Sequence, residues 1–352
     1  MDASSKDRLN YATEAIEFLK ESIRILRQDT YPLDAHRFVI NMLSQATKFM
    51  LPDDGELYDD EEYTSDNIDV MRLPYSICAL EYTAGNKPSD PEDHKSGRER
   101  CDKHISIAFD PHRLPQPLKE ELLKTLDKPN LDDISSNSIA VIALYAFNEN
   151  RSVIRGSEWS FASGVAFIDA ENPFYESSPI RLVDAKFSFF QRNYEYDIRN
   201  GMPPEFGRMA LSDNTQGAVK AALHFATAMS CSNVSTETLK PPPLVNKKRL
   251  SKGKAPLFEY HVLNLDVVHQ DTHAHGSGAL DFSDSAEISG GGSHASPRQH
   301  LRRGHMRRLG EKHGNKVIWV NATVVGKSHK GVIEKSYELE APKAARRSGM
   351  RM

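Results

Sequence analysis

The first clear pattern of apolar and polar positions lies between residues 9 and 26. Six apolar residues recur at intervals of three and four positions: Leu9, Ala12, Ile16, Leu19, Ile23 and Leu26. This spacing places them on one stripe of an α-helix. A second helix is expected to begin at Asp34, whose side chain suits an N-cap, with Phe38, Met42, Ala46 and Phe49 on one side.

Together these two patterns predict a helical hairpin over residues 5–50. The apolar stripe could instead be the seam of a coiled coil that joins two copies of the chain, although it is short for that purpose. A homo-oligomer therefore stays open, and packing within one chain is the favoured interpretation.

Short apolar runs dominate the next part of the chain. Runs rich in β-branched and aromatic residues, bounded by Pro, Gly, Asn and Asp, occur at 76–82, 104–109, 139–147, 159–168 and 186–190. They predict a mostly antiparallel sheet, with a turn at residues 148–151. Helices are expected around Leu118–Leu126 and from an Asp213 cap to Met229, the second nearly apolar and therefore packed on the sheet.

Charge divides the chain in two. The net charge is -4, but residues 241–352 hold 19 Lys and Arg against 10 Asp and Glu, a net of +9, which leaves -13 for residues 1–240. Three prolines, Pro241–Pro243, coincide with the change of sign. They indicate a boundary between two domains, or only a linker before a strand at residues 258–265 that rejoins the first sheet.

The predicted class is therefore α+β, with an N-terminal helical hairpin, a mostly antiparallel sheet with packed helices, and a C-terminal basic β-hairpin. An acidic α+β domain would span residues 1–240, with an acidic loop at 52–70 and the sheet and helices at 71–235. A basic region would span 241–352, with a flexible, Gly-rich and polar loop at 266–297 and the basic hairpin at 298–326.

The basic hairpin begins with the most unusual stretch of the chain. Residues 298–308 contain five arginines and two histidines in eleven positions, and the partner strand is expected within residues 316–325. Alternation along a strand places Arg303, His305 and Arg307 on one face and Arg302, Met306 and Arg308 on the other.

Arginine forks pair with phosphates and carboxylates through two parallel hydrogen bonds, so this hairpin indicates DNA or RNA binding, or binding of a phosphate-bearing ligand. The candidate binding residues are Arg298, His300, Arg302, Arg303, His305, Arg307, Arg308 and Lys316. Aromatic residues for base stacking are sparse nearby, so backbone charge would dominate, with strong salt dependence.

Two less specific interpretations of the basic hairpin stay open. Its arginines could neutralise the acidic run at residues 53–69, in the same molecule or in a second copy, or the hairpin could simply be solvated. The acidic run itself could contact a host protein through Tyr58, Tyr63 and its carboxylates, as a mimic of nucleic-acid charge.

Signs of catalysis are weak. His269, Asp271, His273 and His275 have a spacing that could bind a transition metal, although a polar, His-rich loop is the favoured interpretation. His300 and His305 could act as an acid and base pair in metal-free RNA cleavage. The chain lacks GxGxxG, GxxxxGK[ST] and GxSxG motifs, so no cofactor is expected and enzymatic activity stays open.

The cellular setting is constrained by what the sequence lacks. No apolar run approaches the roughly 18 residues that span a bilayer, and the first residues do not form the apolar core of a signal peptide. Cys78, Cys101 and Cys231 are far apart and form no CxxC pair. We therefore expect a cytoplasmic protein that has no membrane partner.

Three segments resemble uncharacterised proteins encoded by tailed bacteriophages. They are residues 71–82 (MRLPYSICALEY), 258–265 (FEYHVLNL) and 294–326, which include HLRRGH and WVNATVVG. The RRGH stretch is the most specific part of the resemblance. It implies expression in the cytoplasm of an infected bacterium and favours handling of nucleic acid or binding of a host protein, but it carries no catalytic role with it.

Overall fold

The chain forms two compact units in the computed structural model, which describes residues 10–26, 31–57, 71–84, 101–147, 158–168, 185–265, 298–302, 305–314, 316–320, 323–325 and 327–332. The first unit comprises Met1–Val268 and His305–Val320, and the second His269–Gly304 and Asn321–Met352. Within the described ranges, no helix is both long and apolar enough to cross a bilayer.

A nine-stranded sheet forms the centre of the first unit. Its strands are β1 (Thr47–Met50), β2 (Ile77–Thr83), β3 (Cys101–Phe109), β4 (Ile139–Phe147), β5 (Glu158–Phe161), β6 (Gly164–Ile168), β7 (Lys186–Phe189), β8 (Val234–Leu239) and β9 (Tyr260–Leu265). The order is β7-β6-β4-β3-β2-β1-β9-β8, with β5 beside β4. Only β1 pairs in parallel, with β2 and β9, so the prediction of a mostly antiparallel sheet is confirmed.

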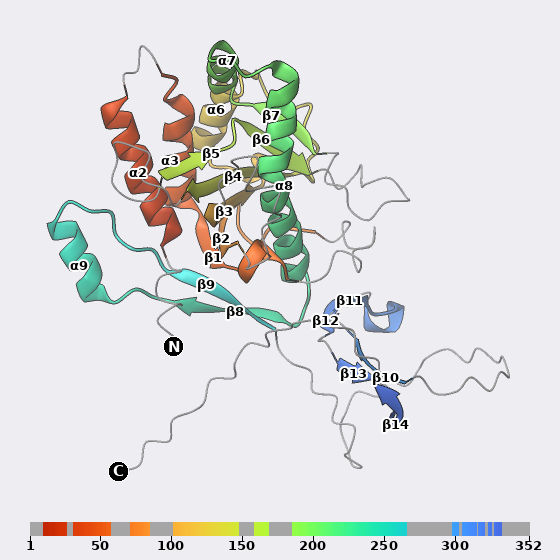
Figure 1. Cartoon of the computed structure of the whole chain (residues 1–352). Helices are drawn as coiled ribbons and strands as arrows, with labels where there is room; N and C mark the ends of the chain where they lie inside the picture. The colour runs from red at the N-terminus through yellow and green to blue at the C-terminus, as the bar shows by residue number, and fades with distance from the viewer. Residues whose placement is uncertain are drawn as a thin grey trace. The chain divides into compact units, whose positions relative to one another are not determined.

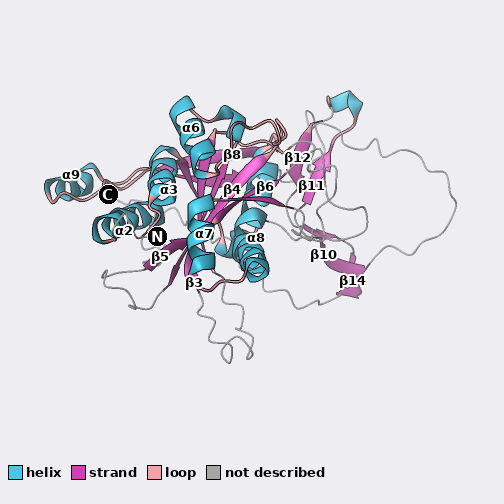
Figure 2. Ribbon diagram, turned by 90° about the horizontal axis from the view of Figure 1, so that it is seen from above, coloured by secondary structure: helices cyan, strands magenta, loops and turns pink. Residues whose placement is uncertain are grey.

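Helices cover both faces of this sheet (Figures 1 and 2). One face carries α2 (Tyr11–Ile25), α3 (Asp34–Gln45) and α6 (Gln116–Thr125), and the other carries α8 (Pro204–Met229). Along β2, Ile77 and Ala79 pack in the first core, whereas Cys78 and Leu80 pack in the second. The fold is therefore α+β, with a sheet between two helical layers.

The middle of the predicted stripe on the first helix is buried within the chain, whereas Leu26, just after the helix, is 37% exposed. Ala12, Ile16 and Leu19 are each at most 2% exposed in the first core, and α2 packs on α3 as the predicted hairpin. Burying an Ile or Leu side chain contributes roughly 1.5–3 kcal/mol. The described part of the stripe therefore stabilises one chain and does not form the seam of a dimer.

The predicted second helix begins at Asp34 as expected, but the N-cap role of Asp34 and the predicted extent of the helix to Phe49 are wrong. Leu33 occupies the cap position and Asp34 is the first helical residue, without a side-chain cap hydrogen bond. The helix ends at Gln45, and Phe49 lies in β1, where it pairs with Leu80 of β2 and His261 of β9. Hydrogen bonds to two neighbouring strands hold this segment extended, which outweighs its helical spacing.

The run at 159–168, predicted as one strand, divides into β5 and β6. Both pair with β4, through Leu144 with Phe161 and Val141 with Ala166. Between them, the Ala162 amide donates to the Ala143 carbonyl (3.0 Å), while the Ser163 carbonyl accepts from the Phe190 amide (2.9 Å). Between β5 and β6 the register against β4 therefore shifts by two residues, as at a β-bulge.

The predicted start of the long helix at Asp213 is also wrong. α8 begins nine positions earlier at Pro204, a residue type that suits the first turn of a helix. Its first two turns expose Phe206 (61%) and Met209 (64%), so no inward apolar stripe marks this start in the sequence. From Ala218 onward the helix is buried against the sheet, as expected.

The change of charge near residue 241 does not coincide with the end of a compact unit. Pro241–Pro243 lead into α9 (Pro243–Ser251), and the chain then returns through β9, which pairs with β1 and β8. Of the two interpretations of this boundary, the strand that rejoins the first sheet is the one found. The loop expected at 266–297, the turn at 148–151 and most of the acidic loop at 52–70 lie outside the described residues.

A buried carboxylate joins three elements of this unit. Glu81, 1% exposed, accepts hydrogen bonds from the first amides of α2, Tyr11 (3.0 Å) and Ala12 (2.7 Å), and from the Tyr260 hydroxyl of β9. It caps a helix whose own cap residue, Asn10, makes no side-chain cap bond. Helix α2, strand β2 and strand β9 therefore meet at one side chain.

The environment of Glu81 sets its ionisation. Burial raises the pKa of Glu81 to about 7, against the lowering effects of Tyr260, the two amides and Lys48. Lys48 is 4% exposed and its ammonium group donates to the Ala46 carbonyl (2.6 Å). The same Nζ atom lies over the Phe258 ring, 3.6 Å from the ring centroid. Burial lowers the pKa of Lys48 to about 8.

A Glu81→Gln substitution should reduce stability most in acid. Because the folded pKa of Glu81, about 7, lies above its ordinary 4.5, its contribution is present below pH 4.5 and is lost as pH rises through 7. The variant should lose about 1–3 kcal/mol of unfolding free energy at about pH 5, and less at about pH 8. Urea denaturation at both pH values measures this.

Glu237→Gln, in the exposed part of β8, is the matched control and should change stability by less than about 0.5 kcal/mol at either pH. A penalty for Glu81→Gln that grows as pH rises would contradict the raised pKa of Glu81.

Candidate functional site

The middle of the predicted basic hairpin, residues 305–320, is present in the first unit as a two-stranded ladder. β11 (His305–Arg308) pairs antiparallel with β12 (Val317–Val320), with Arg308 opposite Val317 and His305 opposite Val320. The Leu309 amide donates to the Lys316 carbonyl at 2.8 Å, which extends the ladder by one residue. The connection contains Gly314 with φ of 67°, a conformation that favours glycine.

One face of this hairpin is anchored to the first unit. Val317 (8% exposed) and Trp319 (6%) form a small apolar cluster with Cys231, Leu57 and Val234. This packing attaches one face of the short hairpin to the rest of the first unit.

A side-chain amide completes the anchor. Asn233 donates from Nδ2 to the Trp319 carbonyl and accepts at Oδ1 from the Trp319 amide, both at 2.7 Å. The neighbouring Ser232 amide donates to the Val317 carbonyl at 3.0 Å. The edge of β12 is therefore hydrogen-bonded as though a further strand lay beside it.

Within β11 the register agrees with the predicted alternation of residues 306–308. Met306 and Arg308 are paired with Trp319 and Val317, whose side chains are buried, and Arg307 is paired with Ile318 on the opposite face. Arg307 and Lys316 are exposed. The hairpin therefore presents basic positions away from its anchor.

The remaining predicted residues are not brought to this hairpin by any described contact. Arg298, His300 and Arg302 lie in β10 (Arg298–Arg302) of the second unit, which pairs antiparallel with β13 (Thr323–Val325) and also borders β14 (Lys327–Val332). Arg303 and the weak metal candidates His269, Asp271, His273 and His275 lie outside the described residues. Across the described ranges, no group of three metal-ligating side chains occurs.

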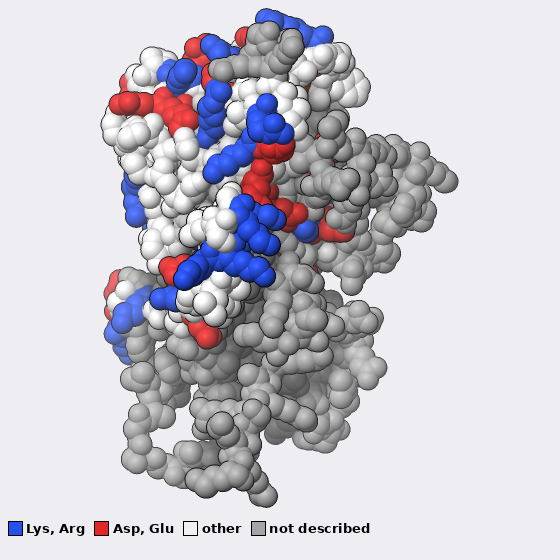
Figure 3. Space-filling view, turned by 90° about the vertical axis from the view of Figure 1, so that its left-hand side faces the viewer, with Lys and Arg blue, Asp and Glu red and all other residues white. Residues whose placement is uncertain are grey.

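A second basic surface is formed by α9 and the residues after it. Figure 3 shows Lys and Arg side chains gathered on the side of the molecule that α9 occupies. The helix buries none of its residues, and Leu244 is 80% exposed. Glu17 of α2 accepts from Arg249 (2.8 Å) and from the Ala255 amide (3.1 Å), which attaches the segment to the fold. The exposed lysines are Lys247, Lys248, Lys252 and Lys254.

The acidic run is partly incorporated into the fold. Glu56 pairs with Lys220 of α8 at 2.8 Å, and Asp53 accepts a hydrogen bond from Thr83. These contacts join the beginning of the run to the second core. Glu56 with Lys220 is a charge pair within the chain, and Thr83 supplies a neutral donor to Asp53.

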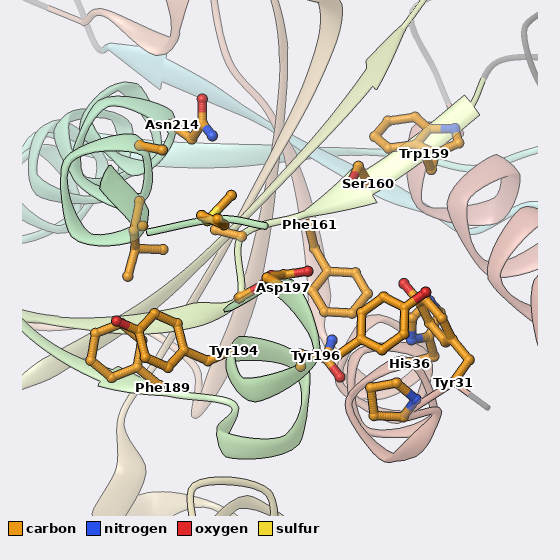
Figure 4. Close-up of a pocket in the computed structure, with 18 of the residues that line it drawn as sticks. Tyr31, His36, Trp159, Ser160, Phe161, Phe189, Tyr194, Tyr196, Asp197 and Asn214 are labelled. Atoms are coloured by element: carbon orange, nitrogen blue, oxygen red, sulfur yellow. The ribbon is translucent and has the colours of Figure 1, made fainter. Parts of the chain in front are cut away.

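A pocket of about 350 Å³, which no sequence pattern predicted, lies beside the break between β5 and β6. Its walls come from α2, α3, β5, α7 (Gln191–Arg199) and α8. Figure 4 shows an aromatic group at one end, with Tyr31, His36, Phe161 and Tyr196. Ring centroids in this group are 4.9 Å apart for Tyr31 and Tyr196, and for His36 and Phe161.

Two residues that line this pocket each contain a buried polar atom without a hydrogen-bond partner. These atoms are Nδ1 of His36, a residue 6% exposed, and Nε1 of Trp159, a residue 3% exposed. Burial lowers the pKa of His36 to about 4, helped by the charge of Arg37, so its imidazole is neutral at pH 7. Buried polar groups are almost always hydrogen-bonded, which makes this pair unusual.

A carboxylate also faces the pocket. Asp197 of α7 accepts a hydrogen bond from the Ser163 hydroxyl at 2.6 Å, at the break between β5 and β6. Burial raises the pKa of Tyr31, and the charge of Asp197 raises it further. The negative charge of Asp197 therefore acts on Tyr31, at the aromatic end of the pocket.

Loss of the Asn233 anchor should release the hairpin. In a Trp159→Phe background Trp319 is the only tryptophan, because the chain has two. Asn233→Ala should cost about 1–3 kcal/mol, since it removes two hydrogen bonds to the backbone of Trp319. We expect a red shift of Trp319 emission and faster quenching by acrylamide.

Asn246→Ala is the control, because Asn246 makes the same pair of bonds to the backbone of Leu257, through its Nδ2 (3.0 Å) and Oδ1 (2.7 Å). A red shift of equal size in this control, or none in Asn233→Ala, would show that Asn233 does not hold the hairpin.

Protonation of His36 should oppose folding. Its folded pKa of about 4 lies below the ordinary 6.5, so the unfolded chain takes up the proton first and stability is lost as pH falls from 6.5 towards 4. His36→Phe keeps a ring and removes this loss. In urea denaturation, the unfolding free energy of the natural chain relative to that of the variant should therefore decrease as pH is lowered from about 7 to about 5. A difference that does not change with pH would refute the lowered pKa of His36.

Comparison with known proteins assigns nothing to this chain. No protein-family profile, curated protein or solved structure matches it. The resemblance to tailed-bacteriophage proteins therefore stays a prediction from three sequence segments. Function has to be argued from the hairpin, from α9 and from the pocket.

Proposed function

We propose that the chain binds nucleic acid through the outward face of the hairpin formed by β11 and β12. The observation that carries the proposal is the one-sided anchor. Trp319, Val317 and Asn233 attach one side of the hairpin, and the exposed Arg307 lies on the other, with exposed Lys316 beside it. A basic strand held in this way can meet a phosphate backbone without losing its attachment.

The chemistry of these residues favours a phosphate backbone over base edges. Guanidinium groups pair with phosphate oxygens through two hydrogen bonds, and lysine adds a point charge. The described residues of the hairpin offer Trp319 as an aromatic side chain, but it is buried in the anchor. Binding should therefore depend strongly on salt and weakly on base sequence.

Three other proposals rest on the sequence alone. They are expression by a phage in a bacterial cytoplasm, contact of a host protein by the acidic run, and a metal-dependent or nuclease-like activity of the His-rich region. The residues that would carry the second and third lie mostly outside the described ranges. The nucleic-acid proposal is the one with a described geometry in its support.

Neutralising the hairpin should abolish nucleic-acid binding. The change is Arg307 and Lys316 to Ala in the full chain, the two exposed basic residues of the outward face. Anisotropy of a labelled DNA duplex and of a labelled single-stranded RNA should report at least about tenfold weaker binding, and the slope of log affinity against log salt should fall by about one for each lost phosphate contact.

The matched control replaces Lys247 and Lys248 of α9 by Ala, an equal change of charge. It should retain most of the binding. Unchanged binding by the hairpin variant, or an equal loss in both variants, would overturn the proposal. Pyrophosphate that competes as well as an oligonucleotide, mole for mole, would mean that the ligand is a small phosphate compound.

A further inference from the structure

We propose that the pocket beside the break between β5 and β6 binds a small organic ammonium ion that also carries a hydroxyl or carbonyl oxygen. The observations are the two unpartnered buried nitrogens, the surrounding aromatic rings and the carboxylate of Asp197. None of these residues belongs to the basic hairpin, so this site is separate from the proposed nucleic-acid surface.

The charge of the wall selects a cation. Asp197 and Glu158 line the pocket, and among the described residues that line it there is no lysine or arginine. In Figure 4 the Asp197 carboxylate lies between Phe189 and Tyr194 at one end and the group with Tyr31 at the other. An anionic ligand would meet an uncompensated carboxylate here, whereas an ammonium ion would neutralise it.

The rings provide the second contribution. An ammonium group over the face of an aromatic ring, within about 6 Å of its centroid, gains about 0.5–2 kcal/mol, most where water is excluded. Tyr31 and Tyr196 meet at an interplanar angle of 66°, and His36 and Phe161 at 75°. Rings at such angles present faces in several directions, as the walls of a cage around a cation do.

The unpartnered nitrogens specify the rest of the ligand. Indole Nε1 of Trp159 can only donate, so it requires an acceptor such as a hydroxyl or carbonyl oxygen. Neutral His36 accepts or donates at Nδ1 according to its tautomer, and a hydroxyl group can satisfy either. A volume of about 350 Å³ lies within the range of small-molecule sites in proteins.

Choline is a suitable probe because it combines a quaternary ammonium with a hydroxyl. Its neutral counterpart is 3,3-dimethylbutan-1-ol, which replaces the nitrogen by carbon and keeps the shape. Isothermal titration of the full chain should detect choline, with the neutral alcohol at least about tenfold weaker. In a Trp319→Phe background, choline should also change the emission of Trp159.

Two substitutions test the assigned roles. Asp197→Asn keeps the shape and removes the charge, and Trp159→Phe keeps a ring and removes the donor; each should weaken choline binding by about tenfold. Glu195→Gln is the control, because Glu195 lies two residues from Asp197 on α7 and hydrogen-bonds to Gln191 on the exposed surface. It should bind choline as the natural chain does.

The comparison of the two probes on the natural chain needs no variant, so it stands even if a substitution prevents folding. Equal binding of choline and the neutral alcohol would overturn the assignment of a cation. Failure of choline to bind at all would also overturn it, and would mean that water satisfies His36 and Trp159.

Discussion

The carboxylate of Glu81 is the interaction on which the arrangement of the first unit depends. A buried carboxylate needs hydrogen-bond donors. Glu81 accepts hydrogen bonds from the first amides of α2 and from the Tyr260 hydroxyl of β9. Helix, central sheet and returning strand are thereby tied together at one point. Burial makes ionisation of the Glu81 carboxyl group unfavourable, and the positive charge of Lys48 partly offsets this effect.

Both basic surfaces depend on the strand that Glu81 holds. β9 pairs with β8, and α9 lies in the connection between these two strands. Asn233, which holds the edge of β12, immediately precedes β8. The hydrogen bonds of Glu81 therefore hold a pair of strands that carries α9 at one end and the basic hairpin at the other. Through this pair, the basic residues of α9 and of the hairpin are attached to the acidic first part of the chain.

Local patterns predicted the parts of this fold that local forces determine. The stripe on α2, the apolar run of β4 and the pairing of β11 with β12 follow from spacing. The strand break at Ala162, the early start of α8 and the pocket could not be predicted, because they depend on contacts between distant residues. His36, Trp159 and Asp197 come from three separate elements, and only the folded sheet brings them to one cavity. Arg307, which was predicted to be a binding residue, has an exposed side chain; its role in binding stays a proposal.

Hydrogen exchange of Tyr260→Phe tests the central role of this junction most directly, because the change removes only the hydroxyl that joins β9 to Glu81. Amides of the first turn of α2, of β8 and β9 and of residues 305–320 should exchange faster together, whereas amides of β3 and β4 keep their natural protection. Faster exchange confined to α2 would contradict the account, because β9 and the hairpin would then be held independently of Glu81.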